Sequence, residues 1–133
     1  MNNELQEIIQ SSTFEVVPGS YVYAQVSTVG DERKHFLVAR DADEITVVTT
    51  EDNLAEMDLI GRNKDNYALI GLRVSVPFYS VGFLALVSQK IAEAGMNILI
   101  VSTYSKDYIM VRQDLLQQTK QVLLGIGFTE YIK

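Results

Sequence analysis

Hydrophobic residues recur along the chain at helical spacing in some segments and as strand-like runs in others. Leu5, Ile8 and Ile9 have the i, i+3, i+4 spacing that predicts a short amphipathic helix at the N-terminus. The Pro18-Gly19 pair that follows predicts a turn, because proline presets its φ and glycine accepts a positive φ. Three runs rich in β-branched or other apolar residues then predict strands at 21–27, 36–39 and 45–49.

The pattern weakens between residues 50 and 64, where the chain becomes acidic and loses its period. A single helical turn around Leu54 to Leu59 is the only element that we predict there. Four consecutive polar residues at 63–66 mark the best boundary in the chain. We therefore predict an N-terminal module over residues 1–65 and a second module over residues 66–133.

The second half has a more regular pattern. A strand at 67–76 precedes a helix at 80–94, which Ser80 is placed to cap and Gly95 to end. A tight hairpin joins strands at 97–103 and 108–112, a helical stripe follows at 115–126, and a strand closes the chain at 128–132. This β-α-β-β-α-β order predicts an α+β, ferredoxin-like fold: an antiparallel sheet with both helices on one face. The first half reads as a degenerate copy of the same unit.

Composition removes several classes of function. The 133 residues include no cysteine and one histidine, which excludes disulfides, thiol chemistry and multi-histidine metal sites. The net charge of −6 argues against nucleic acid as a partner. No signal peptide and no stretch of about 18 apolar residues is visible, so we expect a cytoplasmic protein without a membrane partner. His35 lies in a charged loop without a partner pattern, and we predict no catalytic residue, no metal and no cofactor.

Two features favour a binding site for a small molecule. The predicted helix start at Ser80, Val81 and Gly82 offers backbone amides and a positive dipole end to an anion. The hairpin at 102–108 gathers hydroxyls, the Tyr104 ring and the Asp107 carboxylate, which suits the ammonium group of an amino acid. Taken alone, the first feature also fits close packing at a glycine, and the second fits a polar turn.

The second half of the chain has more apolar surface than one sheet-and-helix unit can bury, which bears on assembly. Phe83 and Leu86 form a second strip on the predicted helix, and residues 98–101 are apolar on both faces of their strand. One sheet-and-helix unit cannot cover both, so we expect the first half or a second copy of the chain to pack there. A homodimer is our prediction.

The second half resembles the ACT domain family in three stretches: VPFYSVGFLA at 76–85, IAEAGMNI at 91–98, and the hairpin pattern STYxxDYIMV at 102–111. The resemblance is to the branch found in aspartate kinases, in small bacterial proteins of two ACT modules, and in the animal cytosolic arginine sensors. Residues 19–50 are similar to the divergent N-terminal module of the small two-module proteins. The resemblance implies two ACT modules per chain.

The resemblance also implies a regulatory, non-catalytic protein that binds an amino acid or related metabolite and acts on a partner protein or its own oligomer. Val81 and Gly82 would present amides to the ligand carboxylate, with Ser80 at the same helix start. Thr103 and Tyr104 would line the pocket, and Asp107 would take an amino or guanidinium group. Lys106 departs from the family, which more often has a small polar residue there. The alternative is a structural or oligomerisation module with a vestigial pocket.

Overall fold

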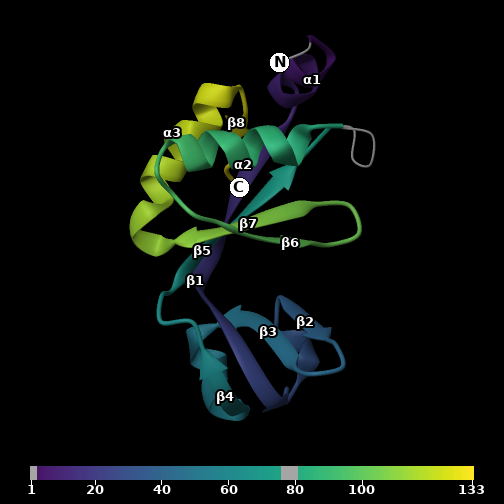
Figure 1. Cartoon of the computed structure of the whole chain (residues 1–133), viewed down its shortest axis with the longest axis vertical. Helices are drawn as coiled ribbons and strands as arrows, with labels where there is room; N and C mark the ends of the chain where they lie inside the picture. Colours follow the sequence, from purple (N-terminus) through teal and green to yellow (C-terminus); the bar gives the residue numbers. More distant parts are fainter. Residues whose placement is uncertain (1–2, 76–80) are drawn as a thin grey trace. The chain divides into compact units, whose positions relative to one another are not determined.

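In a computed structural model, residues 3–75 and 81–133 are described, and they form two compact units (Figure 1). Unit 1 consists of residues 1–18 and 68–133, and unit 2 of residues 19–67. The observed division after Tyr67 lies close to the predicted boundary at 65. It differs from the prediction in giving the first 18 residues to the C-terminal unit. The reason is the N-terminal helix, whose apolar face lies in the core of unit 1.

Unit 1 has the predicted order of elements, with an additional helix and strand contributed by the N-terminal segment. Its elements are α1 (Asn3–Gln10), residues 13–18 of β1 (Thr13–Thr28), β5 (Tyr67–Arg73), α2 (Phe83–Glu93), β6 (Leu99–Ser102), β7 (Asp107–Arg112), η3 (Gln113–Leu115), α3 (Leu116–Ile126) and β8 (Thr129–Glu130). The strands neighbour one another in the order β6-β7-β5-β1, and β8 pairs with β1 at Thr13 and Phe14. This pair is parallel, whereas an all-antiparallel sheet was predicted.

The core of unit 1 lies between its sheet and its helices, which cover one face (Figure 1). Each helix contributes residues at helical spacing, and the strands contribute alternate residues. The buried members include Leu5 and Ile9 of α1, Phe83, Val87 and Ile91 of α2, Leu123 of α3, Ile70 and Leu72 of β5, and Ile109 and Val111 of β7. The predicted α+β, ferredoxin-like arrangement is therefore confirmed in this unit.

Unit 2 repeats the order of elements in reduced form. After residues 19–28 of β1 come η1 (Glu32–Lys34), β2 (Leu37–Arg40), β3 (Ile45–Thr50), η2 (Glu51–Glu56) and β4 (Asp58–Arg62). Short 3-10 helices stand where unit 1 has α-helices. The strands neighbour one another in the order β2-β3-β1-β4, all antiparallel. Its small core is formed by Ala24, Val26, Val47 and Met57.

Several predictions of local structure were wrong. Pro18 and Gly19 lie inside β1, at the point where this strand passes from one unit to the other, and do not reverse the chain. Strand β4 was missed, because its sequence DLIGR has no alternation of apolar and polar residues. Helix α2 begins at Phe83 with Gly82 as its N-cap, whereas the prediction placed the cap at Ser80. Ser80 lies outside the described residues.

The predicted second apolar strip on this helix, Phe83 and Leu86, is covered within unit 1, whose core includes Leu5 and Ile9 from the first half of the chain. Phe83 is 3% exposed and packs edge-on against Phe128 of unit 1, with ring centroids 5.8 Å apart. Leu86 packs against the same core. Phe83 therefore belongs to the buried face of α2 together with Val87 and Ile91, and Leu86 is partly buried beside it. Among the described residues, no helix is long and apolar enough to cross a membrane.

Candidate functional site

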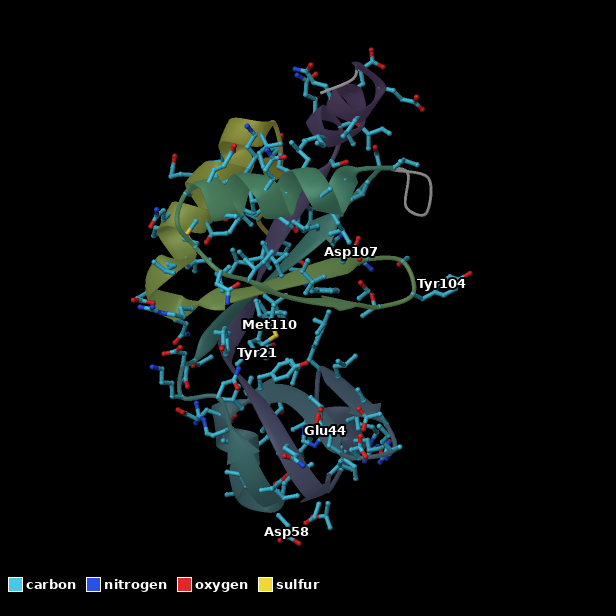
Figure 2. All side chains as sticks on the ribbon, in the orientation of Figure 1. Tyr21, Glu44, Asp58, Tyr104, Asp107 and Met110 are labelled. Carbon is cyan, nitrogen blue, oxygen red and sulfur yellow. The ribbon has the colours of Figure 1, made fainter. Side chains whose placement is uncertain are left out.

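Unit 1 contains a cleft between the start of α2 and the β6–β7 hairpin, with a volume of about 460 Å³. That size falls in the range of roughly 300–1,000 Å³ that is typical of small-molecule sites. In Figure 2, Asp107 lies between the hairpin and the start of α2, and Tyr104 projects from the hairpin tip. The lining residues come from β5, from the start of α2 and from the hairpin: Leu72, Val74, Val81, Gly82, Phe83, Leu84, Ala85, Ser102, Thr103, Tyr104, Ser105, Lys106 and Asp107.

The hairpin fixes the position of Asp107. Ser102 and Asp107 are the last paired residues of β6 and β7, and the Thr103 amide donates to the Lys106 carbonyl at 2.9 Å across the turn. Alternation along β7 puts Asp107 on the same face as the buried Ile109, which is the face that the helices cover. The Ser102 hydroxyl donates to Asp107 Oδ1 at 2.6 Å. Within residues 3–75 and 81–133, Oδ2 accepts no hydrogen bond, which leaves it available to a ligand in the cleft that Asp107 lines.

The start of α2 forms the opposite wall. Gly82 adopts a left-handed conformation with φ +83°, and among the residues that the structure describes no side chain caps the helix. The first helical hydrogen bond runs from the Leu86 amide to the Gly82 carbonyl at 3.0 Å. The amides of the preceding residues, Phe83 to Ala85, have no partner within the helix, and the helix dipole adds partial positive charge there. This wall therefore suits an anionic group.

Every predicted site residue that the structure describes lines the cleft: Val81, Gly82, Thr103, Tyr104 and Asp107. The structure thus brings together two stretches that are well separated in the sequence. Val81 and Tyr104 are 90% and 89% exposed, which places them at the mouth and not in the interior. The later start of α2 shifts the available amides from Val81 toward Phe83 and Leu84.

Sequence reasoning did not include Ser102 or the apolar wall among the site residues. Ser102 could have been found from the hairpin register, because a four-residue turn at 103–106 places residue 102 opposite residue 107. Leu72 and Val74 lie two residues apart, as expected for neighbours on one face of an extended segment. That segment reaches the cleft because β5 lies next to β7 in the sheet.

The cleft contains one side chain of each charge. Lys106 and Asp107 are adjacent in sequence, and both line the cleft. In the part of the chain that the structure describes, Lys106 forms no ion pair with Asp107. Both charges therefore remain available to a ligand.

His35 belongs to unit 2 and lies outside this cleft. Its Nε2 is 2.5 Å from the Val29 carbonyl, and its Nδ1 is 2.9 Å from the Thr49 hydroxyl. The Asn53 amide donates to the same hydroxyl at 2.9 Å. Both ring nitrogens are thus used in holding η1 and β3 together, as expected of a packed loop histidine. Among the residues that the structure describes, no three His, Cys, Asp or Glu side chains are grouped as a metal site would require.

The second half of the chain matches a known protein family. Residues 63–124 match the family model described as ACT domain. These residues form an ACT domain. The match covers β5 to most of α3, so the ACT domain includes both walls of the cleft. No curated protein matches the chain in sequence.

Solved structures resemble the chain over most of its length. A Vibrio cholerae protein of unknown function, described as a possible transport protein, has a TM-score of 0.78 and 24% identity, covering 93% of this chain and 96% of its own. An Agrobacterium tumefaciens protein has a TM-score of 0.68 and 20% identity over 92% and 93% of the two chains. The regulatory subunit of aspartate kinase from Thermus thermophilus has a TM-score of 0.56 and 10% identity, over 85% and 95%. At these identities the likeness is one of fold.

Proposed function

We propose that this chain is a regulatory protein without catalytic activity, which binds a free amino acid in the cleft of its ACT domain. The observation that carries the proposal is the pairing of a half-buried carboxylate with an uncapped helix start across one cleft. An amino acid carries an ammonium group and a carboxylate on one carbon, and the cleft offers a partner for each.

The ammonium group would bind Asp107. The Ser102 hydroxyl holds one carboxylate oxygen at 2.6 Å and so orients the other toward the ligand. A charge-assisted hydrogen bond of this kind is about twice as strong as a neutral one. The ligand carboxylate would lie against the amides of Phe83 to Ala85, beside Val81 and Gly82, at the positive end of α2. Thr103 and Tyr104 would close the cleft beside the ligand.

Three further parts of the proposal concern assembly. We propose that unit 2 is a reduced second ACT module, because its strands β2-β3-β1 neighbour one another in the order of β6-β7-β5 and a short helix stands at each of the two corresponding places in the chain. We propose a homodimer, in which a second copy covers the exposed Val81 and Tyr104 at the cleft mouth. The occupied cleft would then act through that dimer or through a regulated partner protein in the cytoplasm. The net charge of −6 favours a partner other than nucleic acid.

Thermal unfolding with each of the twenty amino acids tests the proposal. A ligand that binds only the folded chain stabilises it by about 2.7 kcal/mol at a hundredfold excess over Kd, which raises the melting temperature measurably. We expect at least one amino acid to do so, and we expect Asp107→Asn to abolish the shift. Asp114→Asn is the matched control, because Asp114 is an exposed carboxylate of unit 1 outside the cleft.

The outcome separates regulation from a purely structural role. If no amino acid stabilises the wild-type chain, the cleft is vestigial and the structural module is the better description. If a ligand binds equally well to the wild type and to Asp107→Asn, the site is elsewhere. Circular dichroism of both variants checks that each has folded.

A further inference from the structure

Resting on the proposed function, we infer that Lys106 selects the class of ligand: an amino acid with an uncharged, apolar side chain, with basic amino acids excluded. The inference depends on three properties of the cleft, which are its charge balance, its apolar wall and the fixed position of Lys106. Each of these comes from described residues of unit 1.

Both charged groups of a bound amino acid have a partner in the cleft. Asp107 and the start of α2 are partners for the ammonium and the carboxylate that all α-amino acids share. The remaining charged side chain that lines the cleft is Lys106, which has no ion pair within the described residues. A ligand with a second ammonium or a guanidinium group would bring a like charge close to Lys106 without a second carboxylate to offset it.

Lys106 is held in a defined place at the edge of the cleft. Its carbonyl accepts the Thr103 amide at 2.9 Å, and the Thr103 hydroxyl approaches the same carbonyl at 3.5 Å. The turn therefore fixes the backbone from which the lysine side chain extends. The residue is half-buried, so its charge is screened less than a fully exposed charge would be.

The inner wall favours an apolar ligand side chain. Leu72 is fully buried and Phe83 is 3% exposed, and both line the cleft together with the partly buried Val74 and Leu84. A polar ligand side chain placed against this wall would lose hydrogen bonds to water without replacing them. An aliphatic side chain there gains binding free energy with each methylene group removed from water.

Isothermal calorimetry with L-leucine, L-methionine, L-arginine and L-lysine tests the inference on the full chain. We expect the wild type to bind an apolar amino acid and to discriminate against the two basic ones. We expect Lys106→Gln to improve the affinity for L-arginine about fivefold relative to that for L-leucine, and Lys106→Arg to keep the wild-type discrimination. Lys64→Gln removes the same charge from an exposed position in unit 2 and should change neither affinity.

Each result has a distinct meaning. Wild-type binding of L-arginine or L-lysine in preference to the apolar amino acids would overturn the inference and leave the proposed function intact. Unchanged discrimination in Lys106→Gln, in a variant with a normal circular dichroism spectrum, would also overturn it. Absence of binding by any amino acid would overturn the proposed function itself, and the inference with it.

Discussion

Unit 2 repeats the order of elements from β5 to β8 of unit 1, and the two units differ at the place where we propose that a ligand binds. In unit 1 a cleft separates the start of α2 from the β6–β7 hairpin. In unit 2 the corresponding elements, η1 and the end of β2, are joined by an ion pair between Glu32 and Arg40 at 2.6 Å. The same order of elements therefore gives a cleft in one unit and a closed contact in the other.

The hairpins themselves are alike. In unit 1 the Thr103 amide donates to the Lys106 carbonyl at 2.9 Å, and in unit 2 the Asp41 amide donates to the Glu44 carbonyl at 3.1 Å. The residue before the turn is small Ser102 in unit 1 and long Arg40 in unit 2. Arg40 reaches Glu32 in η1, so the ion pair depends on both the long residue before the turn and the acidic residue at the start of η1.

The starts of α2 and η1 also differ, because in the described part of the chain only that of η1 is capped by a side chain. Gly82 has no side chain and leaves the first amides of α2 uncapped. Asp31 precedes η1 and accepts the Arg33 amide at 3.1 Å, so a carboxylate of the chain itself occupies the start of that helix. The comparison indicates that a ligand carboxylate can take in unit 1 the role that Asp31 has in unit 2.

Placing an acidic residue at Gly82 should have the largest effect on this comparison. We expect Gly82→Asp to weaken amino-acid binding at least tenfold, because its carboxylate would compete with that of the ligand for the same amides. Gly82→Asn is the control, since both side chains tolerate the left-handed backbone at φ +83° and only one is charged. A Cβ added at Gly82 would have Leu5 Cδ2 at 3.8 Å as its nearest neighbour, so both variants have room.

Isothermal calorimetry measures the amino-acid affinity of the two variants. Equal loss of affinity in Gly82→Asp and Gly82→Asn would mean that a negative charge is not needed for the effect, since the side-chain oxygen of asparagine can also accept the helix amides. Melting temperatures should differ little between the two, because both incur the same strain of about 1 kcal/mol.

The number of amino acids bound per chain should also distinguish the two units. The substitution that tests it, Arg40→Ser, should lower the stability of the fold only slightly. We expect one amino acid per chain, held by unit 1, and we expect Arg40→Ser to leave that stoichiometry unchanged. Removing the Glu32–Arg40 pair should cost about 0.5 kcal/mol of unfolding free energy, because both side chains are more than half exposed. A second binding event in Arg40→Ser would show that the ion pair alone keeps the unit 2 site closed.

Much of unit 1 was predictable because its elements carry strong local signals. The stripe through Val87 and Ile91 has helical spacing, and Gly95 has φ +82° where the predicted helix ends. The Met96 amide donates to the Ile91 carbonyl and the Gly95 amide to the Ala92 carbonyl, which closes the helix in the expected way. The hairpin register then placed Asp107 from sequence alone.

The role of the N-terminal segment could not be predicted from local patterns. Strand β1 supplies residues 13–18 to one unit and 19–28 to the other, and this sharing is decided by pairing with β5, β8, β3 and β4. Pro18-Gly19 has the composition of a turn, yet long-range pairing on both sides keeps the strand extended through it. The role of Gly82 at the site could not be predicted from local patterns either, because the first residue of α2 is decided by the folded chain.

The smallest expected effect concerns the cap of unit 2 and its dependence on pH. Hydrogen bonds from the Arg33 side chain, and then from the Arg33 amide, hold the pKa of Asp31 below its usual value. A carboxyl group whose pKa is lower in the folded than in the unfolded state stabilises the fold above its unfolded pKa. That contribution is lost as the pH falls through the folded pKa.

Asp31→Asn should therefore be slightly less stable than the wild type at neutral pH, and the difference should shrink below about pH 4 and then disappear. Urea unfolding at a series of pH values measures it. Asp43→Asn is the control, because Asp43 is exposed and has no ion pair within the described residues. A difference that persists at acid pH would mean that Asp31 acts through a hydrogen bond that asparagine cannot make. Amino-acid binding should be the same in both variants, since the capped helix of unit 2 has no part in the site of unit 1.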